Sequence, residues 1–527
     1  MNTKKLLLGS LAVGGALALS GKFITKTRSA RLVRRSASYD AVDAYVEEQM
    51  RRLNIPGISL AIVEGDQIVH LRGFGHAHPG GEVPSPQTPF FIGSLTKSVT
   101  ALAVMQLVEA GKVELDAPVQ HYLPWFRVAD PEASAQVTVR HLLNQTSGLP
   151  ESAGETPLAD FDDRPGATER QARALASLQL TRPVGSAVQY CNMNYNLLGL
   201  IVKAASGQSY ADYVQEHIFA PLDMTRTYTS WAVAKQHGLA MGHRYWFGMP
   251  LPAPDLPIPH GSLPSGWLIS TAEDMARYLI AHLNEGRYGE AGVLSAAGIR
   301  ELHRGAVEYR KMGVSAGRYA MGWFDGEIGQ TRVIWHSGTV PDFEGYMAIL
   351  PEQKKGVVLL FNACHWWYNP VLIEFGMNVA ALLAGEQYSP TPFFRVVPWM
   401  LRGQLLIPAL QVADVAATLR LLRRWRLEPE RRPSGGRQWG WHVLLPLIPN
   451  LLVALTLKPM LGERRGYLRL YMPDYSWLAM ICGSFALVWS FLRTGLVLGA
   501  LRGSSPPQPV VERLGTAPGG IEGQGVW

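Results

Sequence analysis

A serine followed three positions later by a lysine, Ser94-Leu95-Thr96-Lys97, occurs once in the chain, after the turn-like Ile92-Gly93 and at the start of a helical pattern. Residues three apart share one face of a helix, so we expect the Lys97 ammonium beside the Ser94 hydroxyl. A serine hydroxyl becomes a nucleophile when a neighbouring base takes its proton, and a lysine with a lowered pKa can be that base. Taken alone, the pattern also fits a helix start with an exposed lysine.

A second candidate is Tyr190-Cys191-Asn192, the only Tyr-x-Asn in the chain, just before a helical pattern that starts at Tyr195. A tyrosine near a lysine can act as a phenolate base or as a proton donor to a leaving group, and an amide can hold a substrate carbonyl. The alternative is a helix start with Asn192 or Asn194 as the N-cap.

The third candidate is His336-Ser337-Gly338-Thr339, which follows the strand-like Val333-Ile334-Trp335. A glycine in a strand lets the backbone approach a ligand closely, and the amide after it can donate to an oxyanion. His-x-Gly also occurs at His78 and His303, so a structural histidine is the alternative reading.

Charge and cysteine content exclude several other functions. The net charge of +7 comes from the first 39 residues, which carry eight Lys and Arg and no acid, so no basic face for nucleic acid is predicted. The three cysteines, Cys191, Cys364 and Cys482, have no metal-binding spacing. We therefore predict no metal site, no organic cofactor and no nucleic-acid partner.

Elements that would position these residues can be read from the hydrophobic pattern. Strands are predicted early and late in the chain, with helices between them, which implies one sheet built from distant segments with a helical region on its side. The predicted strands are Ile58–Val63, Gln67–Gly73, Arg332–Trp335, Gly345–Leu350 and Val357–Asn362. The predicted helices are Asp40–Leu53, Val99–Ala110, Glu169–Leu178, Tyr195–Ala205, Tyr210–Phe219, Thr271–Leu283 and Val371–Ala384.

The order Ser-x-x-Lys, Tyr-x-Asn, His-x-Gly, at separations of about 95 and 145 residues, resembles the penicillin-recognising serine hydrolases, and most of all their class C β-lactamase-like branch. The segments 141–150, 221–224 and 266–274 resemble that family too, and the resemblance covers residues 40–385. It implies an α/β (α+β) fold, in which an antiparallel sheet is flanked by helices and carries an inserted all-helical subdomain, with the active site in the cleft between them.

The resemblance also implies a role for each candidate. Ser94 would be acylated, Lys97 and Tyr190 would share proton transfer, and Asn192 would hold the substrate. The backbone N–H groups of Ser94 and Thr339 would form an oxyanion hole beside Gly338. Which of Lys97 and Tyr190 is the general base stays open at this point.

Two departures from the family pattern bear on the substrate. Lactamases and most DD-peptidases carry a lysine where His336 stands, and histidine there is more similar to D-aminopeptidases and related esterases. We therefore expect D-amino-acid peptides, peptidoglycan fragments or small esters rather than β-lactams. Asp342 stands where relatives commonly have glycine, so we expect the loop after the third strand to narrow the cleft.

The C-terminal region is apolar enough to enter a membrane. Candidate spans are Tyr475–Leu492, Trp439–Leu457 and, less regular because of its polar residues, Gly403–Leu422, for which a surface amphipathic helix is the alternative. The first two spans in chain order are separated by an arginine-rich loop, and basic loops stay in the cytoplasm. The catalytic domain is therefore expected outside the cytoplasm.

These observations give a division of the chain into a signal peptide or membrane anchor with a basic segment (1–37), a hydrolase domain (38–386), a linker (387–398), two to three transmembrane helices (399–502) and a disordered tail (503–527). Cleavage of residues 1–20 is not decided, and a mitochondrial transit peptide is the alternative for the N-terminus. The predicted function is a serine hydrolase bound to the cell membrane, acting on a small molecule or peptide. The alternative is a penicillin-binding sensor or scaffold with little or no turnover. The sequence makes no prediction of oligomeric state.

Overall fold

The computed structural model describes residues 39–159, 162, 164–253, 260–311, 314–387, 396–433, 440–462 and 464–502. It divides the chain into two compact units, of which the first comprises the residues through Leu406 together with Leu457–Met480. The second comprises Ile407–Thr456 and the residues from Ile481 on. The predicted leader, the predicted tail and most of the predicted linker lie outside the described residues.

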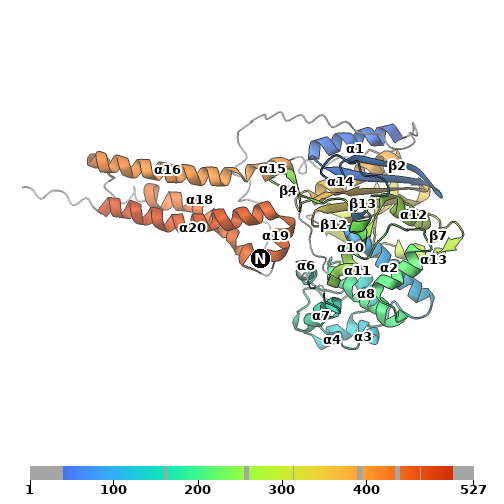
Figure 1. Ribbon diagram of the computed structural model, residues 1–527. Helices are drawn as coiled ribbons and strands as arrows, with labels where there is room; N and C mark the ends of the chain where they lie inside the picture. Colours follow the sequence, from blue (N-terminus) through green and yellow to red (C-terminus); the bar gives the residue numbers. More distant parts are fainter. Residues whose placement is uncertain are drawn as a thin grey trace, which may run out of the picture. The chain divides into compact units, whose positions relative to one another are not determined.

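The first unit is built on an eight-stranded sheet with the order β2-β1-β14-β13-β12-β11-β10-β9 (Figure 1). All neighbouring pairs are antiparallel. Early strands lie beside late ones, as in the register that pairs Leu60 of β1 with Leu359 of β14. The predicted fold class is confirmed. The strands are β1 (Gly57–Glu64), β2 (Gln67–Gly75), β9 (Val307–Lys311), β10 (Val314–Tyr319), β11 (Phe324–Ile328), β12 (Thr331–Val340), β13 (Phe343–Leu350) and β14 (Lys355–Phe361).

Helices cover both faces of this sheet. Helices α1 (Asp40–Leu53) and α14 (Asn369–Ala384) share one core with the β1 side chains Ile58, Leu60 and Ile62, whereas α12 (Ala272–Leu283) shares the other core with the alternate residues of β1 (Figure 1). Because both faces are buried, β1 is apolar at nearly every position rather than at every second one.

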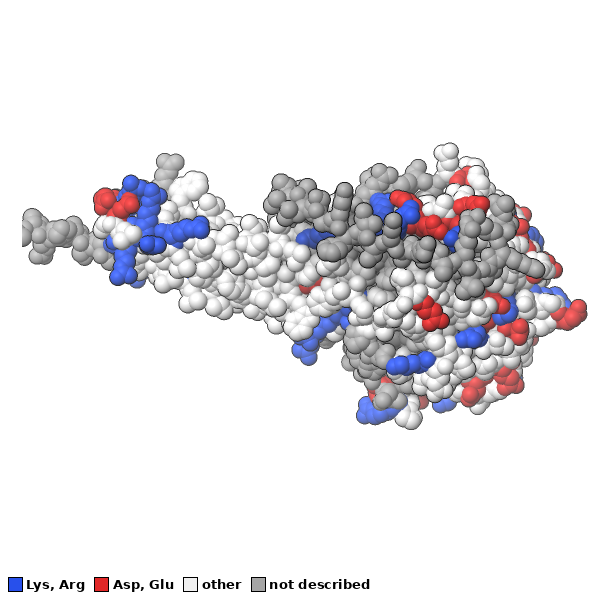
Figure 2. Space-filling model, turned by 45° about the horizontal axis from the view of Figure 1, so that its top comes forward, with Lys and Arg blue, Asp and Glu red and all other residues white. Residues whose placement is uncertain are grey.

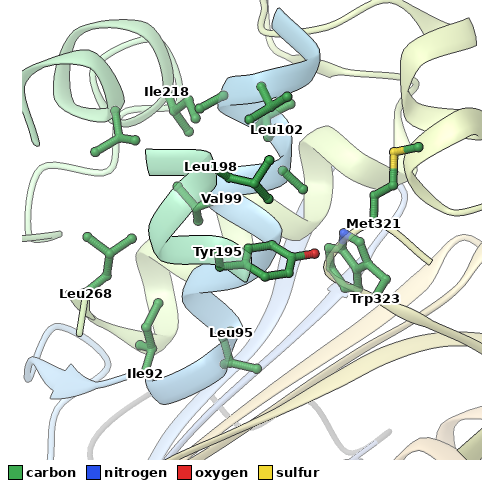
Figure 3. Packing of buried hydrophobic residues seen from close by; sticks show 14 of the residues in the cluster. Ile92, Leu95, Val99, Leu102, Tyr195, Leu198, Ile218, Leu268, Met321 and Trp323 are labelled. Carbon is green, nitrogen blue, oxygen red and sulfur yellow. The ribbon is translucent and has the colours of Figure 1, made fainter. Parts of the chain in front are cut away.

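The helical region is centred on α2 (Thr96–Glu109) and α8 (Asn192–Ser206). Val99 and Leu102 of α2 pack with Tyr195 and Leu198 of α8 in one continuous core (Figure 3). Eleven of the fourteen residues of α2 are buried, so the helix carrying Lys97 has no polar outer face. Other helices here are α3 (Val119–Tyr122), α4 (Pro131–Gln136), α5 (Val139–Leu143), α6 (Glu151–Ala159), α7 (Ala167–Arg173), α9 (Tyr210–Val214), α10 (Trp231–Gln236), α11 (Leu263–Gly266) and α13 (Ala296–Leu302).

The predicted elements are mostly present, with two differences in the sheet. The strand predicted at Arg332–Trp335 runs on to Val340, so His336 and Gly338 lie inside β12 rather than after it. The strands β9, β10 and β11 at one side of the sheet were not predicted, because charged residues and glycines interrupt their alternation of apolar and polar residues.

Three helical stretches are long and apolar enough to cross a membrane: Val397–Leu427, Gly440–Leu461 and Pro473–Arg502. They contain α16 (Leu406–Leu427), α18 (Leu445–Ala454) and α20 (Pro473–Arg502). Figure 2 shows a long surface almost free of charge with Lys and Arg gathered at one end.

Polar residues inside the second unit are paired with one another. The Asp414 carboxylate of α16 accepts hydrogen bonds from Trp489 Nε1 at 2.8 Å and Asn450 Nδ2 at 3.2 Å, and lies 3.6 Å from Arg493 Nε. These partners lie on α18 and α20. The polar residues that interrupt the apolar pattern of each helix therefore form hydrogen bonds and charge contacts with polar residues of the other helices.

Candidate active site

Ser94 lies on a 3-10 turn, Gly93–Leu95, that leads directly into α2. The backbone of this turn lies in direct contact with the backbone of β12. A Cβ on Gly338 would lie 2.0 Å from the Ile92 carbonyl oxygen, and a Cβ on Gly93, whose φ is +56°, would lie 2.4 Å from the Gly338 carbonyl carbon. Both positions therefore require glycine, and the close approach brings the first and third sequence motifs together.

Lys97 occupies the first turn of α2 and has no exposed surface. Its Nζ lies 2.9 Å from Ser94 Oγ, 2.6 Å from Asn192 Oδ1 and 2.6 Å from the Ser265 carbonyl oxygen. Burial lowers the pKa of Lys97 well below its usual value, and among the residues that the structure describes no carboxylate contacts its Nζ to offset the loss of solvation. A neutral amine has two N–H groups, which Asn192 and Ser265 accept, and this leaves its lone pair for the Ser94 hydroxyl.

Tyr190 lies just before α8, with its ring centroid 4.8 Å from Lys97 Nζ. Burial raises the pKa of Tyr190 well above its usual value and outweighs the opposite effect of a side-chain hydrogen bond with Ser94. The phenol therefore keeps its proton at neutral pH. Asn192 is the first residue of α8, and the N-cap position is Cys191, so the reading of Asn192 or Asn194 as a helix cap is wrong.

His336 is 1% exposed, and its Nδ1 lies 2.5 Å from the Ser337 carbonyl oxygen. A carbonyl only accepts, so Nδ1 carries the proton of the neutral ring. The buried Nε2 has no hydrogen-bond partner among the described residues and is an acceptor. Burial, reinforced by the neighbouring Lys97, lowers the pKa of His336 to about 3. The ring is therefore uncharged at neutral pH.

The buried carboxylate of Glu344, which belongs to none of the three sequence motifs, lies beside Thr339. Thr339 Oγ1 donates to Glu344 Oε1 at 3.0 Å, and Asn369 Nδ2 donates to the same oxygen at 2.9 Å and to Thr339 Oγ1 at 2.6 Å. Sequence reasoning missed Glu344 and Asn369 because each is a single residue in an otherwise apolar element. It missed Ser265 because that residue contributes only a backbone carbonyl.

Asp342, where a glycine was expected, has a φ of +71°. Its side chain is buried and forms a two-bond ion pair with Arg244 of β4 (His243–Trp246), at 2.7 and 2.6 Å. The left-handed backbone explains the preference of relatives for glycine. Narrowing of the cleft by this loop stays a prediction.

No group of three or more potential metal ligands occurs among the described residues. A cavity of about 740 Å³ lies elsewhere, at the far end of α2 and beside Gln106, Glu109 and His217, and it touches none of the predicted site residues. The three motifs thus meet at Ser94, whereas the large cavity is a separate feature.

Comparison with known proteins shows the family of the chain. The family model described as "Beta-lactamase" matches residues 42–379. Protein flp of Staphylococcus aureus strain MW2 is 28% identical over 347 residues, which cover 64% of this chain and 65% of that protein. Penicillin-binding protein 4 of Amycolatopsis lactamdurans is 33% identical over 322 residues, covering 59% of this chain and 81% of the relative.

Solved structures show the same architecture. An octameric penicillin-binding protein homologue from Pyrococcus abyssi has a TM-score of 0.59 and 29% identity, over 67% of this chain and 79% of that one. A class C beta-lactamase mutant has a TM-score of 0.53 and 21% identity, over 65% of this chain and 97% of that one. The second likeness is one of fold alone.

Proposed function

The chain belongs to the β-lactamase family, and from that premise we propose that it is a membrane-anchored serine hydrolase that forms an acyl-enzyme on Ser94. The observation that carries the proposal is the pair of Ser94 Oγ and Lys97 Nζ, 2.9 Å apart, with the amine buried and its pKa lowered. A neutral amine at this distance is a competent general base for a serine hydroxyl.

In the proposed reaction, Lys97 Nζ takes the Ser94 proton as Oγ attacks the substrate carbonyl carbon. The negative charge that develops on the carbonyl oxygen is stabilised by the N–H groups of Ser94 and Thr339, and two such donors supply several kcal/mol. Tyr190, whose phenol stays protonated, donates to the leaving amine or alcohol as the tetrahedral intermediate collapses to the ester. The Lys97 ammonium then returns a proton to the Tyr190 oxygen. In the second half of the reaction, Lys97 takes a proton from the water that attacks the ester carbonyl carbon, and this proton passes to Ser94 Oγ as the acid leaves, which restores the Ser94 hydroxyl.

The state of His336 supports a substrate other than a β-lactam. A neutral ring gives a carboxylate no cation to pair with. We propose D-amino-acid peptides, peptidoglycan fragments or small esters as the substrates.

The way in which the chain divides into two compact units supports three crossings of the cell membrane. The segment Leu457–Met480, which runs from the end of the second apolar helix into the start of the third, belongs to the same folded unit as the catalytic residues. Both must therefore lie on one side of the bilayer, which is satisfied when the first two helices both cross. The basic loop between those helices, which includes Arg420, Arg423 and Arg424, favours the cytoplasm and puts the catalytic unit outside it.

Intact-mass measurement on the full chain in detergent tests the proposal. Samples are incubated with an activated acyl ester or with a penicillin, beside the Ser94→Ala variant. Ester turnover that requires Ser94 supports a hydrolase, and a persistent penicillin adduct without turnover supports the sensor reading instead. No Ser94-dependent change with either compound contradicts the acyl-enzyme.

A further inference from the structure

Residues 464–474, which we call the docking segment, follow the second apolar helix, include the first two residues of the third, and are part of the catalytic unit. The segment contains α19 (Arg465–Tyr471) and ends at Asp474, immediately before the apolar stretch of α20. Tyr467 and Tyr471 are buried in the same hydrophobic core as α2 and α8. A simple connection between two membrane helices would not require this burial.

The docking segment is fixed to the catalytic unit by buried polar contacts. Asp474 Oδ1 lies 2.9 Å from His365 Nε2, with both side chains fully buried, and Asp474 Oδ2 accepts from the Phe247 backbone N–H at 3.0 Å. The Trp366 N–H donates to the Tyr471 carbonyl oxygen at 3.0 Å. Breaking one partner of a buried polar pair leaves the other without solvation, so these contacts specify one position for the segment.

From this fixed position the segment reaches α6. Arg464 forms a two-bond ion pair with Glu155, in which Nε donates to Oε2 at 2.5 Å and Nη2 donates to Oε1. The Glu155 side chain is 9% exposed, so the pair is largely removed from solvent on the carboxylate side. A planar guanidinium binding both carboxylate oxygens fixes orientation as well as distance.

Helix α6 lies directly against the substrate side of the site. A Cβ on Gly154 would lie 2.4 Å from the Asn192 backbone nitrogen and 3.0 Å from its Cβ. Asn192 in turn accepts the hydrogen bond from Lys97 Nζ. A small shift of α6 is therefore transmitted to Asn192, because closely packed backbones cannot move independently.

We propose that the docking segment is a positioning element of the active site, which holds α6 through Arg464 and Glu155 and thereby fixes Asn192 for substrate binding. The inference rests on the proposed function, since it assigns Asn192 to the substrate. Ser94 and Lys97 are held by α2 and its core, so loss of the ion pair should weaken binding more than it slows the chemical step.

Kinetics on the full chain in detergent test this with Arg464→Gln, the charge-exchanged pair Arg464→Glu with Glu155→Arg, and the control Arg469→Gln. Arg469 lies in α19, five residues after Arg464, and its Nη2 contacts Met480 Sδ at an exposed position. With an activated acyl ester, we expect Arg464→Gln to raise KM roughly fivefold or more with kcat within about twofold of wild type. The exchanged pair should restore KM, and Arg469→Gln should leave it unchanged.

An unchanged KM in Arg464→Gln, or a loss of activity that follows a lower Tm and is not restored by the exchange, overturns the proposal. Hydrogen exchange provides a readout that does not need turnover. Amides of α6 and of the first turn of α8 should exchange faster in Arg464→Gln, and equal exchange overturns the proposal even if wild type shows no activity. Absence of activity in wild type contradicts only the proposed hydrolysis.

Discussion

At the scale of single residues, burial determines the protonation states of the ionisable groups in the site. Lys97, Tyr190 and His336 are all shifted toward their neutral forms, and burial is the largest cause for each. The structure therefore favours an answer to a question that the sequence left open. A neutral lysine can accept the Ser94 proton, whereas a protonated phenol can only donate, so Lys97 is the proposed base and Tyr190 the proposed acid.

The pH dependence of Ser94 acylation follows from these directions. Protonation of Lys97 removes the base, so the rate falls as the pH drops through the lowered pKa of Lys97 and reaches its plateau at a lower pH than an ordinary lysine would allow. Tyr190 adds no alkaline loss below pH 10, because its pKa is raised above that value. Stopped-flow labelling with an acyl fluorophore from pH 5 to pH 10 measures the profile. A rate that climbs steadily toward pH 10 would indicate an ordinary lysine and contradict this assignment.

The control for that experiment is Lys97→Ala. General base catalysis typically contributes about 10²–10⁴-fold, so this variant should label more slowly by that factor. Tyr190→Phe should lower the plateau but leave the position of the acid limb unchanged, since it keeps the ring over Lys97 and removes only the proton donor.

At the scale of secondary structure, two elements meet at the site without side chains between them. The nucleophile turn and β12 touch at Gly93 and Gly338, which allows the Thr339 N–H to be near Ser94. This contact was predictable in part. The glycine after His336 indicated a close backbone approach, but the identity of the approaching segment depends on a pairing of β12 with residues some 240 positions earlier.

Substitution of Gly338 by alanine should separate the two elements. The added Cβ would overlap the Ile92 carbonyl oxygen at 2.0 Å, so the turn must move. We expect the free energy of unfolding to fall by about 1–3 kcal/mol, as for other overpacked sites, and Ser94 labelling to slow by an order of magnitude or more. Thermal melts and labelling rates measure both quantities.

Gly403→Ala is the matched control, because nothing lies within 4 Å of a Cβ there. Wild-type labelling in Gly338→Ala would show that the turn and β12 do not need this distance, and would contradict the proposed oxyanion hole.

An element could be predicted from the sequence when its own apolar pattern identifies it, and could not when it depends on a partner that is distant in the chain. The hairpin β1–β2, the helices α2, α8 and α12, and the strands β13 and β14 have apolar patterns that identify them, and the sequence analysis found each. The strands β9 to β11 add to the sheet one after another from β12, which pairs with β11, and no short window of sequence contains these partners. The docking segment was missed for the same reason, since its partners are distant in the chain.

At the scale of the whole molecule, stability is linked to pH through buried histidines. His282 Nδ1 lies 2.9 Å from His303 Nε2, and both rings are buried behind α2 with Trp323. Burial lowers the pKa of His303 to about 3 and that of His282 well below its usual value. With His336, three histidines are neutral in the folded chain at pH values where an unfolded histidine is protonated.

The sign of the effect follows from proton counting. Between about pH 6.5, the unfolded value, and pH 3, the unfolded chain binds more protons, so the free energy of unfolding falls as the pH falls. Each of these histidines should lower the free energy of unfolding by roughly 2 kcal/mol between pH 7 and pH 5. Thermal melts of the full chain in detergent should therefore give a lower Tm at pH 5, and His303→Gln should reduce the difference relative to wild type.

The exposed His121 provides the comparison, since His121→Gln should leave the pH dependence of Tm as it is in wild type. Equal pH dependence in wild type and His303→Gln would mean that the histidine pair is protonated or solvated in the folded chain.

The position of the docking segment also has a consequence for biosynthesis. Glu155 pairs with Arg464, which follows it by 309 residues, and His365 pairs with Asp474, which follows it by 109 residues. During translation, the ribosome completes the first two apolar helices before the last residues of the catalytic unit emerge. If the docking segment positions α6 as proposed, the nascent chain cannot complete the candidate active site until those two helices have been synthesised, so its maturation is tied to the synthesis of the apolar helices.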